Sequence, residues 1–214
     1  MEYPKPMTLR LAVIVLALGA AGAAQGSKVP GWKLSGMAAR EYEISVDREV
    51  FHGGHASALV RCTRLRCKTF GTLMQGIRAD DFIGRRVRLS AWVRAENAQS
   101  PRLWMRIDGP AGEVVGFDNM DGRAKSGTFE WRRQEIVLDV TEPGMMIYFG
   151  LILERRGQAW VDDVTLEVVD RKVKTTRAQQ GVSPSRGDPM VLRKAYLNAP
   201  AAPANPDFEQ DAAR

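Results

Sequence analysis

The stretch Arg86-Val-Arg-Leu-Ser-Ala-Trp-Val-Arg94 alternates between apolar and polar side chains, apart from one indole on the polar side. One face carries Val87, Leu89, Ala91 and Val93, and the other carries Arg86, Arg88, Ser90, Trp92 and Arg94. A period of two is typical of a β-strand with one face in a core and the other outside it. The stretch therefore predicts a half-buried strand in a β-rich protein.

Similar runs follow along the chain, at 103–108, 136–140, 145–153 and 159–169. The run from Met145 to Leu153 is almost wholly apolar, which predicts a central strand covered on both faces. Turn signals such as Pro143-Gly144 separate the runs at hairpin spacing, and only Arg78 to Ile83 indicates a helical turn. We therefore expect an all-β fold, an antiparallel β-sandwich of the jelly-roll type, over residues 25–170.

The beginning of the chain resembles a secretory signal. Lys5 and Arg10 precede an apolar run at 11–18 and small residues at 19–24, which is the usual order in such signals. A membrane anchor is the alternative, but a membrane span needs about 20 apolar residues. We therefore expect a signal peptide at 1–24 and a periplasmic or secreted protein that does not contact the membrane after cleavage.

The chain is basic, with 31 Lys and Arg against 25 Asp and Glu. The surplus is scattered through the expected strands, whereas a nucleic-acid surface needs a concentrated patch. We expect no nucleic-acid partner, and we interpret the charge as a solvated exterior that also favours anionic polymers.

Cys62 and Cys67 are the only two cysteines, and they flank a short loop, Thr63 to Arg66. Export places them where thiols oxidise, so we expect a local disulfide that contributes about 2 kcal/mol. A metal site is less favoured, because His52 and His55 are the only histidines and nothing completes a ligand set.

After the expected sandwich, residues 171–203 are rich in Lys, Thr, Gln, Ser, Pro and Ala. Such a composition buries little apolar surface, so we expect a flexible linker, disordered as a C-terminal extension. Asn205-Pro-Asp-Phe-Glu209 then places an aromatic residue next to acids. We expect residues 204–214 to dock back on the sandwich as a terminal strand, although Pro206 cannot donate to a strand ladder.

Several short motifs occur in a recognisable order: Trp32-Lys-Leu-Ser-Gly36, His52-Gly-Gly-His55, Trp104-Met-Arg-Ile-Asp108, Phe117-Asp-Asn-Met120 and Trp160-Val-Asp-Asp-Val164. Over residues 29–169 the chain resembles the galactose-binding-like jelly rolls, the fold of many carbohydrate-binding modules. In particular it resembles a set of exported bacterial proteins without an established activity. In that fold an Asn-x-x-Phe-Glu segment usually opens the first strand, so its place at 205–209 here implies a circularly shifted arrangement.

The resemblance also implies a structural calcium ion. In galactose-binding-like domains an aspartate of the closing strand joins such a site, and hard oxygen ligands suit Ca²⁺. The corresponding candidates here are Asp163, Asp47 and Glu209. The alternative is that Asp162 and Asp163 accept hydrogen bonds from backbone amides and terminate the sheet.

Trp92, Trp104 and Arg106 lie on the polar side of neighbouring alternating runs, and Arg88 shares the face of Trp92. Exposed indoles stack on sugar rings, and arginine donates to hydroxyl or acidic groups. These four residues form a glycan platform if both runs lie in one sheet with an open face. The alternative is that the indoles cover a second small core or lie under loops, since large aromatic side chains are mostly buried.

The leading interpretation is an exported, non-catalytic binding domain for a carbohydrate or a cell-envelope polysaccharide, with calcium as its one expected cofactor. The runner-up is an envelope module for protein–protein interaction or assembly. A glycoside hydrolase-like enzyme comes third, because two carboxylates about 5 to 9 Å apart are needed for that reaction and acids such as Asp108 and Asp118 more often form turns. We assign no catalytic residue, since a sandwich supports many functions.

Overall fold

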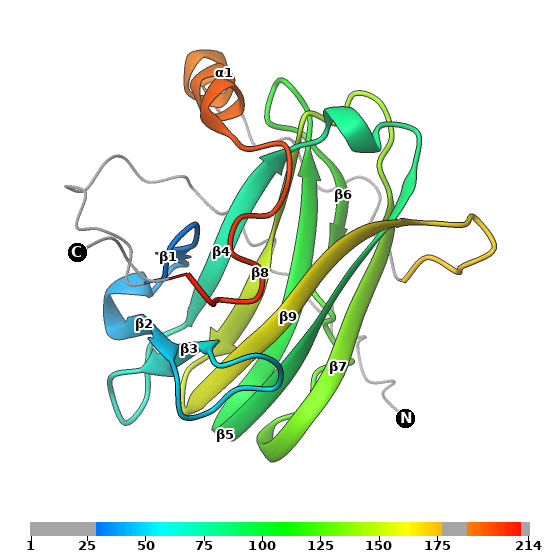
Figure 1. Ribbon diagram of the computed structural model, residues 1–214. Coiled ribbons are helices and arrows are strands. Elements are labelled where there is room, and N and C mark those ends of the chain that lie inside the picture. Colours follow the sequence, from blue (N-terminus) through cyan, green and yellow to red (C-terminus); the bar gives the residue numbers. More distant parts are fainter. Residues whose placement is uncertain (1–28, 177–187, 211–214) are drawn as a thin grey trace, which may run out of the picture.

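The computed structural model describes residues 29–176 and 188–210 (Figure 1). The signal-peptide prediction for residues 1–24 falls outside these ranges. Within them, none of the helices combines the length and the apolar character that crossing a membrane would need.

The protein is an antiparallel β-sandwich, as the alternating runs predict. Sheet A has the strand order β1 (Lys33–Ser35), β4 (Phe70–Arg78), β8 (Met146–Glu154), β5 (Arg86–Asp108) and β6 (Val114–Asp118). Sheet B has the order β2 (Tyr42–Asp47), β3 (Ser57–Cys62), β9 (Gln158–Val169), β5 and β7 (Gly127–Asp139). All of these pairs are antiparallel, so the prediction of fold class is confirmed.

The long strand β5 belongs to both sheets and joins them (Figure 1). Its first part, Arg86 to Ala98, pairs with β7 and β9, and its second part, Gln99 to Asp108, pairs with β8 and β6. Asn97 and Ser100 have positive φ angles of 47° and 52° at the transition, where the ladder is irregular. The two halves of one strand therefore present their outer side chains on different faces of the sandwich.

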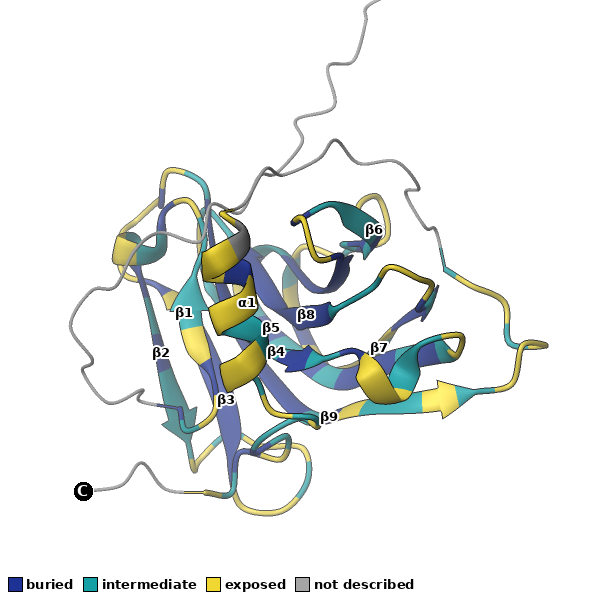
Figure 2. Ribbon diagram, turned by 90° about the horizontal axis from the view of Figure 1, so that it is seen from above, coloured by how far each residue is buried: buried dark blue, intermediate teal, exposed yellow. Residues whose placement is uncertain are grey.

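The main core lies between the two sheets and contains the apolar side chains of the alternating runs. From β5 it contains Val87, Leu89, Val93, Leu103, Met105 and Ile107. The predicted central strand is confirmed, because β8 lies between β4 and β5 and all but its last residue are buried (Figure 2). The predicted helical turn is also present, as the 3₁₀ helix η2 (Asp80–Phe82). A second 3₁₀ helix, η1 (Ala39–Glu41), precedes β2.

Cys62 and Cys67 form the expected disulfide at the end of β3. Backbone hydrogen bonds hold the same loop, since Cys62 N donates to Gly157 O and Cys67 N donates to Arg155 O, at 3.0 and 2.5 Å. The bridge therefore fixes residues 63–66 beside the turn between β8 and β9.

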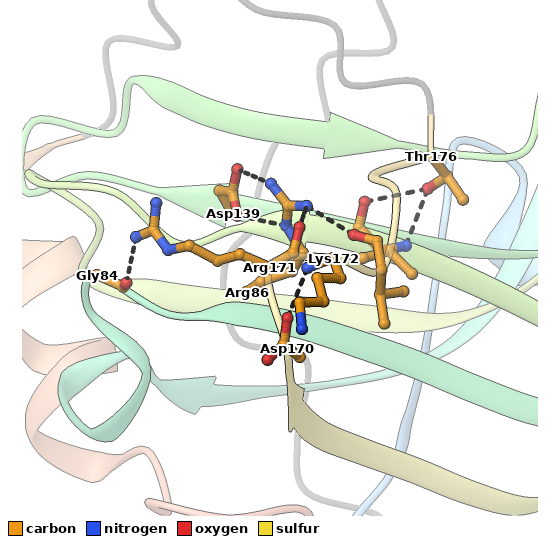
Figure 3. A network of polar contacts seen from close by, with 9 residues as sticks. Gly84, Arg86, Asp139, Asp170, Arg171, Lys172 and Thr176 are labelled. Atoms are coloured by element: carbon orange, nitrogen blue, oxygen red, sulfur yellow. Dashed lines mark hydrogen bonds and ion pairs between the residues drawn. The ribbon is translucent and has the colours of Figure 1, made fainter.

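Residues 170–176 follow β9 and are held against β5 and β7 (Figure 3). Arg86 makes two hydrogen bonds of 2.8 Å to the Asp139 carboxylate, and its Nη1 donates to the carbonyl oxygens of Arg171 and Val173. Thr176 N donates to Val137 O at 3.0 Å. The first part of the expected linker is therefore attached to the sandwich edge.

The expectation of a flexible linker over residues 171–203 is wrong in part, because this segment contains a helix. Helix α1 spans Pro189–Asn198, and the Asp188 carboxylate accepts a hydrogen bond from Met190 N at its start. Leu192 is buried, and Tyr196 packs against the outer face of sheet A. A capping aspartate and two anchoring side chains thus stabilise a short helix that its average composition does not reveal.

The C-terminal segment docks in the opening between the sheets, but residues 204–210 form turns and no strand. Phe208 is fully buried with its ring 5.2 Å from the Trp32 ring, and Val164 N of β9 donates to Pro206 O. Asn205 and Phe208 have positive φ angles of 45° and 58°, which a continuous strand does not accommodate. The segment supplies core side chains without extending a ladder.

Candidate functional site

The four residues of the expected glycan platform do not form one surface. All lie on β5, but Arg88 and Trp92 belong to its sheet-B half and Trp104 and Arg106 to its sheet-A half. The outer faces of the two sheets are separate sides of the sandwich. The condition for a single platform, both runs in one sheet with the same open face, is therefore not met.

Trp104 is a core residue of the sheet-A side. Only 1% of its surface is exposed, and its Nε1 donates to Thr72 Oγ1 at 2.8 Å. Because Trp104 is on β5 and Thr72 on β4, the indole reaches across Gly150 of the intervening β8. It belongs to a second small cluster with Phe70, Met74, Met146, Tyr148 and Ile152. Trp104 therefore follows the alternative of a second core.

Arg106 is also largely buried, and Asp108 holds it in place. Its Nε and Nη2 donate to the two Asp108 oxygens, both at 2.7 Å, and its guanidinium lies 5.5 Å from the centre of the Tyr148 ring. Burial raises the pKa of the Asp108 carboxyl, although the Arg106 charge opposes this change. Arg106 thus supports Tyr148 from one side and does not project to solvent.

Tyr148 contributes to a pocket of about 300 Å³ on the outer side of sheet A. Its lining residues are Gly31, Lys33, Gln75, Gly76, Met146, Tyr148, Ala195, Asn198, Ala199 and Pro200. Gly76 lies directly beside the Tyr148 ring, because a Cβ atom at this position would stand 2.5 Å from two ring carbons. Burial raises the pKa of the Tyr148 hydroxyl, which has no hydrogen-bond partner among the described residues. The ring is therefore fixed, and 4% of the residue is exposed.

Helix α1 and the residues after it form the other wall of this pocket. Tyr196 Oη donates to Asp80 Oδ1 at 2.8 Å, and Arg78 N at the end of β4 donates to Pro200 O at 2.9 Å. Ala204 N and Gln75 Oε1 form a further bond of 2.9 Å. These contacts place Asn198 and Ala199 over the sheet, so the C-terminal part of the chain completes the pocket.

The outer face of sheet B is different, since the β2–β3 loop, residues 48–56, folds over it. The His52 ring is stacked on Trp92 with ring centres 4.0 Å apart, and His52 Nδ1 lies 2.7 Å from Asp163 Oδ2. Asp162 Oδ2 accepts hydrogen bonds from His52 N and Gly53 N at 2.8 and 3.1 Å. Trp92 is thus half covered by a held loop.

Arg88 belongs to the same face and forms an ion pair with Glu167 on the adjacent strand β9, at 2.7 Å. Both side chains are partly exposed. Arg88 is therefore placed in a cross-strand pair, with Trp92 further along the same side of β5.

The three carboxylates expected to bind calcium lie around this loop. Asp47 accepts from Trp160 Nε1, Glu49 N and Val50 N, and Glu209 Oε1 accepts from His55 N and Ala56 N. Across residues 29–176 and 188–210, His, Cys, Asp and Glu side chains nowhere gather in threes that could hold a metal. As placed, Asp163, Asp47 and Glu209 do not fit a shared ion, and calcium stays a prediction from the resemblance.

Sequence reasoning missed Tyr148, Gln75 and the contribution of α1 to the pocket. Tyr148 is the one hydroxyl-bearing residue in the apolar run of β8, and Gly76 opposite it is one of the two glycines of β4, the other being Gly71. Those two features are the available signals. By contrast, nothing in the local sequence pattern indicates that α1 packs beside Tyr148.

No family model matches the chain. A curated relative, the uncharacterized HTH-type transcriptional regulator YbfP of Bacillus subtilis, is 40% identical over 154 residues, which is 71% of this chain and 52% of the relative. The chain thus spans about half the length of that relative.

Among solved structures, the enzymatically active domain of bacteriophage CBA120 tailspike protein 4 aligns with a TM-score of 0.53 and 15% identity, over 69% of this chain and 21% of that one. This likeness concerns the fold alone. A xylan-binding domain from Paenibacillus barcinonensis Xyn10C aligns at a TM-score of 0.48 with 14% identity, over 65% of this chain and 86% of that domain. TmCBM61, solved with β-1,4-galactotriose, aligns with a TM-score of 0.46 and 17% identity, over 67% of this chain and 92% of that one.

Proposed function

We propose that this domain binds carbohydrate without transforming it, in the pocket between Tyr148 and helix α1. The observation that carries the proposal is the pocket itself, whose volume of about 300 Å³ matches the smaller ligand pockets, which begin at about 300 Å³. A site of this size takes one or two sugar units.

The lining has the mixed character that sugar recognition needs. Tyr148 and Met146 are 4% and 3% exposed, so together they contribute a small apolar area to the pocket lining, against which the carbon face of a sugar ring packs. The Tyr148 hydroxyl, Lys33 and Asn198 provide groups that exchange hydrogen bonds with sugar hydroxyls. Arg106 and Trp104, proposed from the sequence as contacts, act here as supports behind the surface.

Binding is preferred to hydrolysis because the buried carboxylates on this side of the molecule are already engaged. Asp108 is paired with Arg106, and Asp118 accepts from Arg123 Nη2 and Met120 N at 2.5 and 2.8 Å. A glycosidase needs one carboxyl to donate a proton and another to act as base or nucleophile. Each of these two acids instead holds an arginine.

Glycan binding is tested by calorimetric titration of the purified protein with soluble oligosaccharides, including xylo- and galacto-oligosaccharides. Tyr148→Ala should lower affinity at least tenfold, and Tyr148→Phe, which keeps the ring, should lower it only severalfold. Trp92→Ala on sheet B is the matched control and should bind as the wild type does. Loss of binding in Trp92→Ala with retention in Tyr148→Ala would move the site to sheet B.

A second candidate function is ligand sensing inside a regulator, and the regulator name of the curated relative favours it. A helix-turn-helix reads DNA with a pair of helices, whereas the described part of this chain has α1 as its single α-helix. A shared stretch of 154 residues must include most of the sandwich. In that role the sandwich is a companion domain that binds the effector.

The two candidates differ in compartment, and export is part of the first. The Cys62–Cys67 disulfide supports export, because such bridges persist in oxidising compartments. Mass spectrometry of the protein from its native cells, with thiol labelling, decides between them. Loss of the first 24 or so residues with oxidised cysteines supports export, while an intact N-terminus with free thiols supports the intracellular regulator.

A further inference from the structure

A second pocket, of about 340 Å³, lies beside the disulfide loop at the far end of the sheet-B half of β5. It is lined by Arg61, Cys62, Arg64, Leu65, Glu96, Asn97, Arg156, Gly157 and Gln158. These residues come from β3, the disulfide loop, β5, the turn between β8 and β9, and β9. It shares no lining residue with the Tyr148 pocket.

The charges around this pocket are unbalanced. Arg61 is paired with Glu43, and Glu96 is paired with Arg94 at 2.9 Å, so these charges have partners of their own. Arg64 and Arg156 are exposed and have no ion pair or side-chain hydrogen bond within the described residues. Two guanidinium groups therefore remain uncompensated at one opening.

The groups that carry these charges are held in position. The disulfide closes the loop that bears Arg64, and Gln99 N donates to Arg156 O at 3.2 Å. Gly157 has a φ angle of 83°, and a Cβ atom there would lie 2.3 Å from Asn97 O, so the turn fits closely against β5. The backbone beneath both arginines is thus fixed before any ligand arrives.

The pocket also offers neutral donors and an apolar rim. The Asn97 side-chain amide has no hydrogen-bond partner within the described residues, whereas the Gln158 amide donates to Glu96 Oε2 at 2.8 Å. Leu65 is fully exposed at the tip of the loop between Arg64 and Arg66. Guanidinium forks and amide N–H groups together match the oxygens of a compact anion.

We propose that this pocket binds the anionic group of a small ligand, a phosphate, a sulfate or a carboxylate, between Arg64 and Arg156. Asn97 donates to the same group from β5. Leu65 contacts the apolar part of the ligand next to the charge. This site is independent of the carbohydrate pocket, and an acidic ligand here leaves Tyr148 untouched.

The test is a titration of the ¹⁵N-labelled protein, followed by backbone amide chemical shifts, with inorganic phosphate, sodium sulfate and galacturonate as separate probes. Saturable shifts at Arg64, Asn97 and Gly157 with at least one probe are expected. Galacturonate alone would identify a sugar acid as the source, and phosphate or sulfate would identify an inorganic-type oxyanion. Absence of saturable shifts at these residues with all three probes would overturn the proposal.

Substitutions separate a site from a general charge effect. The double variant Arg64→Gln, Arg156→Gln should weaken binding at least tenfold, and both positions are exposed, so the fold is retained. The double variant Arg85→Gln, Lys172→Gln also removes two positive charges, at exposed positions near the opposite end of this half of β5, and should bind as the wild type does. Equal weakening in this control variant would contradict a defined site.

Two further measurements test whether this pocket, and not the carbohydrate pocket or a membrane-binding surface, is the site. Tyr148→Ala should retain anion binding, so a failure of the carbohydrate proposal leaves this one standing. Vesicles of phosphatidylcholine with phosphatidylserine test for a membrane surface instead. Vesicle binding lost in Leu65→Ser but retained in the double arginine variant would replace the pocket by lipid docking and overturn the proposal.

Discussion

Trp92 and Trp104 stand on the same strand, β5, yet one indole is a surface group and the other a core group. Trp104 reaches across β8 to Thr72 and lies beneath the side chains of sheet A. Trp92 lies on sheet B, where it carries the ring of His52 and keeps part of its surface exposed. Because β5 passes from one sheet to the other, equal positions in a repeating pattern meet different neighbours. Whether a tryptophan of β5 is exposed therefore depends more on the sheet face that it occupies than on its residue type.

The largest expected effect separates these two tryptophans. Trp104→Ala should lower the free energy of unfolding by about 3 to 5 kcal/mol, since it empties a packed site and leaves Thr72 without its donor. Trp92→Ala should cost about 1 kcal/mol, as one stacked pair is lost at a half-exposed position. Urea denaturation followed by circular dichroism measures both. Equal losses would show that the two faces are packed alike.

The sheet-B loop gives the next effect. Asp162→Asn should destabilise the protein by about 1 to 3 kcal/mol, because both carboxylate oxygens accept backbone N–H groups and an amide turns one acceptor into a donor. Asp163→Asn, the matched control, should cost under about 1 kcal/mol, since it loses only a partly exposed pair with His52. Thermal unfolding with far-UV detection compares them, and a reversed order would refute this account of the loop.

Acid titration contrasts a carboxylate from each face. The hydrogen bond from Arg86 lowers the pKa of Asp139 below its usual value. Its contribution to stability is therefore present above the unfolded pKa, near 3.9, and is lost as pH falls through the lower folded value. Asp139→Asn should flatten the fall in stability on the acid side of that value.

The pKa of Asp108 on sheet A shifts in the opposite direction to that of Asp139. Burial raises its folded pKa, so the folded state binds more protons and stability declines as pH rises from the unfolded pKa to the folded one. Asp108→Asn should remove that decline. Denaturant midpoints measured from pH 2.5 to 7 test both variants, and two curves with the same slope change would show that the faces do not differ in this respect.

Calcium should have the smallest effect. The carboxylates of Asp47 and Glu209 accept N–H groups of the loop, and the described residues contain no group of three acids, histidines or cysteines placed to hold an ion. We expect no change in the unfolding midpoint when chelator is replaced by millimolar calcium. A rise of several degrees would mean that the loop rearranges around the ion, as the resemblance to calcium-binding jelly rolls implies.

Much of the sandwich was predictable because its strands are amphipathic and a period of two is a local property. The alternation at Val87 and Leu89 fixed which side of β5 enters the core, and the apolar run of β8 indicated a covered strand. The disulfide followed from the short spacing of its cysteines and the expected compartment. Helix α1 was missed because its stability depends on Leu192 and Tyr196 meeting the sandwich.

The candidate site was less predictable than the fold. The outer side of β5 could be read from the sequence, but nothing local shows that the strand changes sheets near Asn97 and Ser100. Nor does local pattern show that residues after Pro189 fold back beside Tyr148. Arg106 and Trp104 were therefore assigned to contact, whereas the structure uses them as support.

By itself the sequence determined the strands, their inward faces and the cysteine pair, because periodicity, turn residues and short loop length act within a few residues. Only the tertiary structure decided which acids are paired, where the C-terminal segment packs and that Arg64 and Arg156 line one pocket. Those properties depend on groups distant in the chain, whose approach is set by packing of the two sheets and the C-terminal segment. Local pattern carries no information on such contacts.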